Sequence, residues 1–321
     1  MKKIFSVMAA FVLGAFVMTS CSSDDNNDSN PVNPQTGGTL AVAKNKADAV
    51  KLTFPEGSDV KEVIADEGGN FEALISQDLY DKLNGGVASA RALKDIPAGY
   101  VFVTGKYTVD GTTYVFEGFL RVTVEKNTNG TADVTVTTAE GEPVVEGTTV
   151  QVETQGEAKG LTSDICRGWT IVNTAFDYYE YDVNGKENNH YQANFYKPEE
   201  ARSLVYMKNW FENEHRDVKI DADFSKKVEI KNVVFNQFGK FTINFLDEAS
   251  IGTWSWKDEA AGQLKYNWED ESMDNDFETG VAHVEMQKGY LVLTLSGQVK
   301  QKERSNMTYR VDVQFVLAED K

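Results

Sequence analysis

The second half of the sequence is a series of short segments, rich in β-branched and aromatic residues, that tight turns separate. The segments cover residues 169–181, 228–235, 240–246, 251–256, 263–268, 281–286, 290–299 and 309–317. In the last one, Tyr309, Val311, Val313, Phe315 and Leu317 alternate with polar residues, which is the period of a half-buried strand. About eight short strands in sequential order predict an antiparallel up-and-down barrel over residues 161–321. Closure would also remove the exposed edges of an open sheet.

One helix interrupts this series between its first and second strands. Pro198 suits the first helical position, and Glu199 and Glu200 suit the positive first turn. An apolar stripe follows, made of Ala201, Leu204, Val205 and Phe211. We expect the helix to cover one mouth of the barrel.

Residues 39–155 predict a smaller module of mixed character. Segments 49–54 and 60–65 have strand character, and Ser76 begins a short helix. Asp110-Gly111 and Asn129-Gly130 are strong hairpin turns between further strands, and residues 148–154 suit a last strand. We therefore expect a small α+β or mostly β module with an antiparallel sheet. The polar segment 155–160, with two glycines, marks the boundary before the barrel, so the chain as a whole is mainly β.

Composition limits the partners of this chain. Hydrophobic residues make up 41% of it, which is enough for sizeable cores. The formal net charge is −18 and the sequence pI is about 4.6. The phosphates of nucleic acid would be repelled, and an anionic membrane surface would not attract the chain by charge. We therefore exclude nucleic acid and expect membrane attachment to come from a lipid.

The N-terminus has the features of a targeting segment. Lys2 and Lys3 precede an apolar run, residues 4–17, that is too short to span a membrane. Met18-Thr19-Ser20-Cys21 then resembles a bacterial lipobox, in which small residues precede the acceptor cysteine. The resemblance implies a signal peptide over residues 1–20. It also implies a diacylglycerol and an N-acyl chain, such as palmitate, on Cys21, since stable anchoring takes more than one acyl chain.

Residues 21–38 form a polar linker in which no core can form. The linker contains Asp24, Asp25 and Asp28, two prolines, and Gly37-Gly38. Its acidic start resembles the export signal of Bacteroidota-type surface lipoproteins, which implies a location on the outer face of the outer membrane. A plain solvated tether is the alternative.

The predicted barrel resembles the lipocalin-like (calycin-like) domains of such surface lipoproteins over residues 161–318. The resemblance lies in Arg167-Gly168-Trp169, Gly239-Lys240-Phe241, Gly252-Thr253-Trp254-Ser255-Trp256 and Leu291-Val292-Leu293-Thr294-Leu295. A lipocalin has Gly-x-Trp on its first strand, whereas Gly168 and Trp169 are adjacent here. The resemblance implies binding of a small, often apolar ligand, without a reaction and without a cofactor.

An aromatic hairpin is the first candidate site. A turn near Ala260 would place residues 254 and 266 opposite each other, so that four aromatic side chains share one face. These are Trp254, Trp256, Tyr266 and Trp268. An inward face would line a cavity for a ring or an acyl chain, and an outward face would form a platform for a sugar. The same residues can also simply fill the barrel, which is the commonest use of aromatics.

Tyr179 is the second candidate. Consecutive Tyr178 and Tyr179 must point to opposite faces of a strand, so one of them faces outward. An outward tyrosine near the rim of the barrel can contact a ligand or can be an ordinary surface residue.

Metal and nucleophilic chemistry have little support in the sequence. With Cys21 lipidated, Cys166 has no intramolecular partner and is expected to be buried. His190, His215 and His283 lack zinc spacing and lie in no catalytic motif. The acidic run 269–278 does not fit an EF-hand loop, which favours a solvated loop over calcium. No spacing singles out paired carboxylates for glycoside hydrolysis.

The sequence thus favours a lipid-anchored surface protein whose C-terminal barrel binds a small apolar molecule or a glycan fragment. A structural or interaction subunit of an outer-membrane complex is the alternative from another class, and a hydrolase is the least favoured. The sequence leaves the oligomeric state open.

The variant Cys21→Ser tests the proposed anchor. Without the acyl chains, we expect the protein to leave the membrane fraction and yet remain folded, because the linker adds nothing to a core. Cell fractionation and circular dichroism check the two expectations. Retention in the membrane fraction would show that Cys21 is not the anchor.

Overall fold

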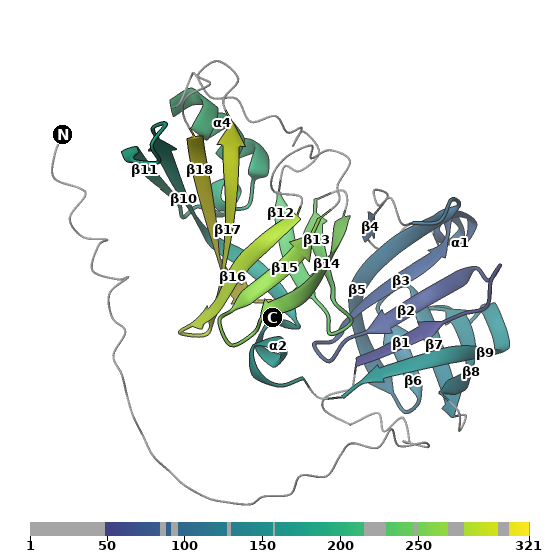
Figure 1. Ribbon diagram of the computed structural model, residues 1–321. Coiled ribbons are helices and arrows are strands. Elements are labelled where there is room, and N and C mark those ends of the chain that lie inside the picture. Colours follow the sequence, from purple (N-terminus) through teal and green to yellow (C-terminus); the bar gives the residue numbers. More distant parts are fainter. Residues whose placement is uncertain are drawn as a thin grey trace, which may run out of the picture. The chain divides into compact units, whose positions relative to one another are not determined.

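The computed structural model describes residues 49–83, 88–90, 96–126, 130–156, 158–214, 229–246, 249–268, 279–300 and 308–320 (Figure 1). Predictions on Cys21, the linker, Asn129, His215 and the acidic run 269–278 lie outside these residues and stay predictions. The chain is mainly β, as its sequence predicts, with two closed eight-stranded antiparallel barrels. Both lie in one compact unit, Thr36–Lys321. No helix in the described residues has the length and apolar character needed to cross a membrane.

In place of the small module expected over residues 39–155, the structure has a complete barrel of eight strands. Its strands in ring order are β1 (Ala49–Thr53), β2 (Val60–Ala65), β3 (Asn70–Ser76), β5 (Tyr100–Asp110), β6 (Thr113–Phe116), β7 (Leu120–Lys126), β8 (Thr131–Thr138) and β9 (Pro143–Gln155). The β3–β5 and β1–β9 pairs close the ring, and the short strand β4 (Ala88–Ala90) adds to β5.

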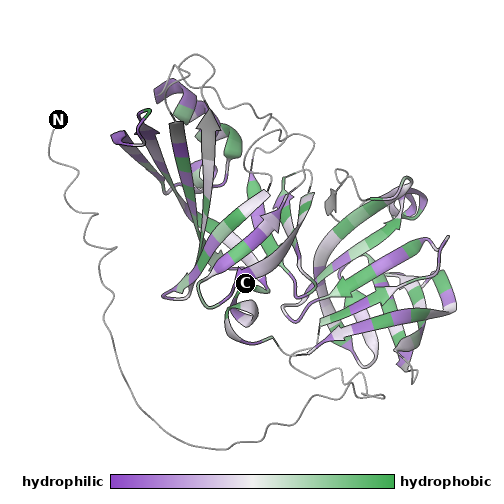
Figure 2. Ribbon diagram, in the orientation of Figure 1, coloured by the Kyte–Doolittle hydropathy of each residue, from purple (hydrophilic) through white to green (hydrophobic). Residues whose placement is uncertain are grey.

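Along the strands of the first barrel, inward-facing residues alternate with outward-facing residues, as a closed ring requires. Tyr114, Phe116, Leu120, Val122 and Val124 are all buried, as the sequence predicts. The predicted helix is α1 (Gln77–Lys82), and the Ser76 hydroxyl accepts a hydrogen bond from the Leu79 amide at its start. This is the usual capping contact of a serine before a helix. Figure 2 shows the resulting alternation of hydrophobic and hydrophilic residues along the strands.

The second barrel confirms the predicted eight-stranded ring. Its strands in ring order are β10 (Gly168–Tyr181), β12 (Ile230–Phe235), β13 (Lys240–Phe245), β14 (Ala249–Asp258), β15 (Gln263–Asn267), β16 (Thr279–Gln287), β17 (Tyr290–Lys300) and β18 (Thr308–Glu319). Pairing of β10 with β18, from Trp169↔Glu319 to Tyr181↔Thr308, closes the ring. The predicted helix is two helices, α3 (Pro198–Ala201) and α4 (Leu204–Glu214), and α2 (Gly160–Ile165) precedes β10.

Strand β10 has two different neighbours along one edge, which the sequence does not indicate. Its first residues pair with β12, whereas residues from Thr174 onward pair with the additional strand β11 (Glu187–Phe195). Helix α3 lies at the point where these two strands part. The Thr174 hydroxyl donates to the Ala201 carbonyl (2.7 Å), Arg202 Nε donates to the Ile171 carbonyl (2.8 Å), and the Ile230 amide donates to the Arg202 carbonyl (2.8 Å). The end of α3 thus supplies hydrogen-bond partners that a continuous strand would supply.

The β13–β14 pair needs a glycine at position 252. Gly252 lies directly opposite Phe241, whose ring covers it. A Cβ atom at this position would lie 2.2 Å from Phe241 Cζ and 2.6 Å from the backbone oxygen of Asn267. The glycine therefore leaves room for the Phe241 ring on the inner side of the neighbouring strand.

We expect Gly252→Ala to lower the free energy of unfolding by about 1–3 kcal/mol, because the added methyl group overpacks the wall. Chemical unfolding followed by circular dichroism measures this. Gly156→Ala is the matched control, since a Cβ atom there meets nothing within 4 Å, and its effect should stay within about 0.5 kcal/mol. Equal stability of the two variants would contradict the packing argument.

Candidate functional site

The aromatic hairpin has the predicted register and faces the interior of the second barrel. Trp254 pairs with Tyr266, as the sequence predicts, and Trp256 pairs with Leu264. Trp254, Tyr266 and Trp268 are buried members of the barrel core, and Trp256 packs against this core while remaining partly buried. The structure therefore brings the four predicted residues together on an inner wall and gives no outward platform at this hairpin.

Trp254 is fixed by the β12–β13 turn. Its indole N–H donates to the carbonyl oxygens of Asn236 (3.1 Å) and Lys240 (3.0 Å). The ring packs edge-on against Phe235 and Trp256. Because its only polar group is satisfied within the protein, Trp254 offers a ligand its apolar ring alone.

Trp256 serves to hold helix α2. Its indole N–H donates to the Thr162 hydroxyl (2.7 Å), and Glu259 Oε1 accepts hydrogen bonds from the amide (3.0 Å) and the hydroxyl (3.1 Å) of the same threonine. Ile165 and Cys166, at the end of this helix, are buried in the barrel core. Burial raises the pKa of the Cys166 thiol, which fits the small apolar role expected for it.

Tyr266 differs from Trp254 and Trp256 in the hydrogen bonding of its polar group. Its hydroxyl makes no hydrogen bond to any other residue that the structure describes. Burial alone raises its pKa to about 12, so the hydroxyl is a neutral donor at physiological pH. The hydroxyl lies against Gly280 on β16, where a Cβ atom would be only 2.9 Å away. The inner wall thus holds one hydrogen-bonding group that has no described protein partner.

Three side chains on the inner side of the second barrel remain partly buried. Met286, Leu293 and Leu295 pack against its core without being fully covered. Leu293 and Leu295 belong to the middle of β17, so this exposure is not confined to a strand end. The first barrel has partly buried side chains of the same kind, such as Val109 and Val152.

Tyr179 lies apart from the aromatic hairpin. Tyr178 is buried in the core, so Tyr179 is on the outer face of β10. The His190 ring stacks on it with centroids 4.3 Å apart, and the Arg310 guanidinium lies 5.0 Å from its centroid. His190 in turn lies 2.7 Å from Asp177. Burial and the nearby carboxylates raise the pKa of Tyr179. The ring is thus engaged by neighbouring side chains and does not form a free stacking platform.

Some residues of these two regions carried no signal in the sequence. Met286, Leu293 and Leu295 look like ordinary strand residues, and only their register in a closed barrel places them against the core that contains Tyr266. Asp177 and Arg310 belong to strands 133 residues apart in the chain, which pair only through closure. Their alternation predicts an outward face but not the neighbours they meet there.

Comparisons of the chain with protein-family models, with curated proteins and with solved structures found no match. The lipocalin-like resemblance therefore stays an expectation drawn from the sequence.

Removal of the Trp254 N–H tests its role in fixing the inner wall. We expect Trp254→Phe to lower the free energy of unfolding by about 1–3 kcal/mol, because the hydrogen bonds of the indole N–H are lost and the smaller ring leaves space in the core. Trp256→Phe is the matched variant. It loses one hydrogen bond at a partly buried position, and we expect its free energy of unfolding to fall by about 1 kcal/mol. Urea unfolding of both variants checks the order. A larger loss in Trp256→Phe would show that the α2 contact matters more.

Proposed function

We propose that this protein is a lipid-anchored cell-surface binding protein whose second barrel holds a small, largely apolar molecule. The observation that carries the proposal is the Tyr266 hydroxyl, which has no partner among the described residues and lies on an otherwise apolar inner wall. Binding sites for small molecules combine such walls with a few placed polar groups. The preferred ligand has an apolar body and one group that accepts a hydrogen bond.

The incomplete shielding of this wall supports the same proposal. Leu293, Leu295 and Met286 are partly buried although they pack against the core. A ligand that covers these side chains would gain about 25 cal/mol for each Å² of apolar surface that it removes from water. The first barrel also has partly buried side chains against its core, such as Val109 and Val152, so the choice of the second barrel rests on Tyr266.

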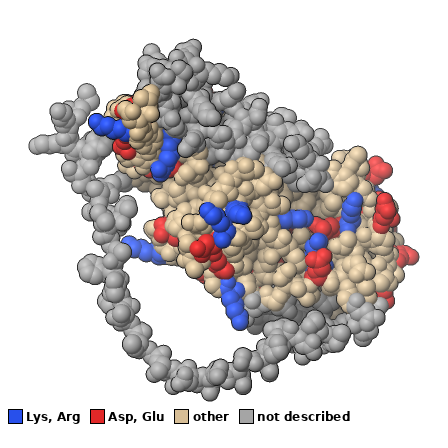
Figure 3. All heavy atoms as spheres, viewed as in Figure 1, with Lys and Arg blue, Asp and Glu red and all other residues tan. Residues whose placement is uncertain are grey.

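An apolar ligand is favoured over a glycan fragment at this site. A sugar ring stacks on the open face of an aromatic side chain, whereas Trp254, Tyr266 and Trp268 are buried and the Tyr179 ring is engaged by His190 and Arg310. On the face drawn in Figure 3, basic and acidic side chains lie interspersed, which gives no single-sign patch there for a charged polymer.

The location is part of the proposal and rests on the sequence. The lipobox-like segment that ends in Cys21 would supply the acyl chains, and the polar linker would keep the barrels clear of the outer membrane. An anchored binding protein can retain a ligand at the cell surface without any reaction. The interaction-subunit alternative would need no space beside Tyr266.

Native mass spectrometry of the full-length protein, purified from its own membranes, tests the proposed ligand site. We expect an added mass on the native chain and its loss in Leu293→Trp, which fills space on the inner wall at β17. Val281→Trp is the matched control, because Val281 is 41% exposed on the neighbouring strand β16, and it should retain the mass. Tyr266→Phe should lower the occupancy several-fold through the lost hydrogen bond.

A native chain without added mass, or an equal mass on Leu293→Trp, would contradict binding inside the second barrel. In that case the interaction-subunit alternative would be favoured. The exact mass and its fragments would give the chemical class of the ligand.

A further inference from the structure

A continuous set of contacts joins the first barrel to the second within the compact unit. Phe102 of β5 packs with Ala249 and Ile251 of β14 in a small apolar cluster of its own. Beside it, the Thr104 hydroxyl donates to Asn244 Oδ1 (2.9 Å). We call this set of contacts, together with those of Glu62 and Glu72 described next, the seam.

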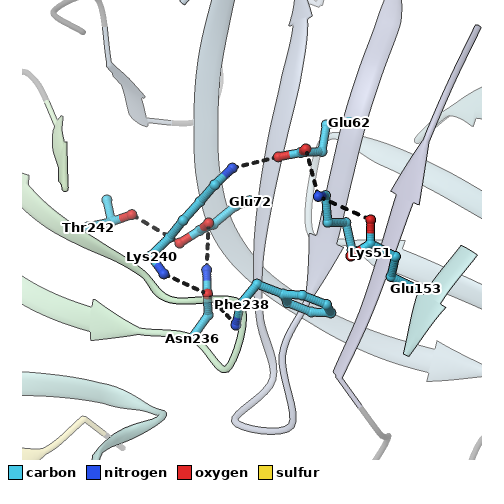
Figure 4. Close-up of polar contacts among 8 residues, drawn as sticks. All are labelled: Lys51, Glu62, Glu72, Glu153, Asn236, Phe238, Lys240 and Thr242. Carbon is cyan, nitrogen blue, oxygen red and sulfur yellow. Dashed lines mark hydrogen bonds and ion pairs between the residues drawn. The ribbon is translucent and has the colours of Figure 1, made fainter. Parts of the chain in front are cut away.

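Glu72 is the central polar group of the seam. It lies on β3 between Phe71 and Ala73, which belong to the first barrel's core, so its own side chain leaves the outer face of that barrel. Both carboxyl oxygens bond to the second barrel. The Thr242 hydroxyl lies 3.0 Å from Oε1, and Asn236 Nδ2 donates to Oε2 at 2.8 Å (Figure 4).

The charges around Glu72 do not neutralise it directly. The nearest cation is Lys240 of β13, whose ammonium group is held by Glu62 Oε1 at 2.6 Å rather than by Glu72. Glu62 in turn lies 3.6 Å from Lys51 of β1, which also meets Glu153 of β9. The acidic group that faces Glu72 from its own barrel, besides Glu62, is Asp66. Glu72 is therefore a buried carboxyl group that forms no ion pair with any residue the structure describes.

Burial raises the pKa of Glu72 to about 7, although Lys240 and the Thr242 hydrogen bond oppose the shift. The cause is desolvation, because a carboxylate buried without a partner loses far more hydration than two neutral hydrogen bonds replace. The protonated form is thus the one that the closed seam prefers.

The partners of Glu72 can serve either form of its carboxyl group. Asn236 has a fixed orientation, since its Oδ1 accepts hydrogen bonds from the amides of Phe238 (2.9 Å) and Lys240 (3.1 Å). Its Nδ2 therefore always donates to Glu72. The Thr242 hydroxyl can donate to a carboxylate or accept from a carboxylic acid by rotation. The seam can therefore hold a protonated Glu72 with every hydrogen bond made.

We propose that Glu72 is a proton-dependent latch, which holds the two barrels together as a carboxylic acid and loosens the seam as a carboxylate. In an open seam, Glu72 would be hydrated and would titrate in the ordinary glutamate range. The closed seam then binds the proton more tightly. Closure is therefore fully favoured below about pH 4.5 and weakens as the pH rises through about 7. Between pH 5 and pH 8 the closure equilibrium should fall about a hundredfold.

Distance measurement across the seam tests the latch in the full-length protein in detergent micelles. Spin labels on cysteines introduced at the exposed positions Glu125 of β7 and Lys265 of β15 report the separation of the barrels by pulsed electron resonance. Cys166 is buried and should not take a label. We expect a narrow distance distribution at pH 5 and a broader one at pH 8.

Glu72→Gln mimics the protonated side chain and should keep the distribution narrow at both pH values. Glu153→Gln is the matched control, because this exposed glutamate contacts Lys51 but none of the second barrel's residues that bond to Glu72, and it should respond to pH like the native chain. Asp66 also has a raised pKa, to about 6, but its side chain bonds to Asn70 within its own turn. Asp66 is present in both variants, so its titration cannot cause a difference between them.

An equal distribution at pH 5 and pH 8 in the native protein, or a pH response that survives in Glu72→Gln, would overturn the latch. Should Glu72→Gln not fold, carbon-13 titration of the Glu72 carboxyl group in the native protein decides. A pKa near neutrality would support the latch, and a pKa of about 4.3, the value of a free glutamate, would overturn it. None of these measurements requires a ligand.

Discussion

Closure of each sheet by its first and last strands is the constraint on which the rest of the molecule depends. In the second barrel, β10 pairs with β18 although more than a hundred residues separate the two strands in the chain. Without this pairing, both strands would have an open edge and the sheet would not enclose an interior. The pairing fixes the alternation of every strand, because each residue must then face either the interior or the outside. The inner wall with Tyr266 and the outer pair Tyr179 and Arg310 follow from that one pairing.

The same architecture gives two closely related interiors. Both cores combine aliphatic side chains with buried rings, among them Phe71, Phe116 and Phe119 in the first barrel and Phe241, Trp254 and Tyr266 in the second. Both also place a glycine against a ring, Gly105 against Phe71 and Gly252 against Phe241. The interiors differ in a polar group: the Tyr107 hydroxyl of the first barrel donates to the Asp66 carbonyl, whereas the Tyr266 hydroxyl has no partner among the described residues.

Local patterns in the sequence predict the strands, but not the contacts that only closure creates. The eight strands of the second barrel, the Trp254↔Tyr266 register and the Ser76 helix start are all properties of neighbouring residues. Strand β3 is not predicted from the sequence although Phe71, Ala73 and Ile75 face the core on either side of Glu72, because it runs directly into helix α1 at Ser76 with no turn between them. Strand β11 is not predicted either, because Glu187–Phe195 is mostly polar and exposed.

Glu72 is unusual because an outward-facing carboxyl group of a barrel strand is buried. Its position fits the alternation of the strand, but its burial opposes stability. The β12–β13 turn that receives it has a second role, because the Asn236 carbonyl oxygen accepts the indole N–H of Trp254. One turn therefore touches the buried carboxyl group through its side chain and the inner wall of the second barrel through its backbone. Asn236 is therefore the residue at which the seam and the inner wall of the second barrel meet.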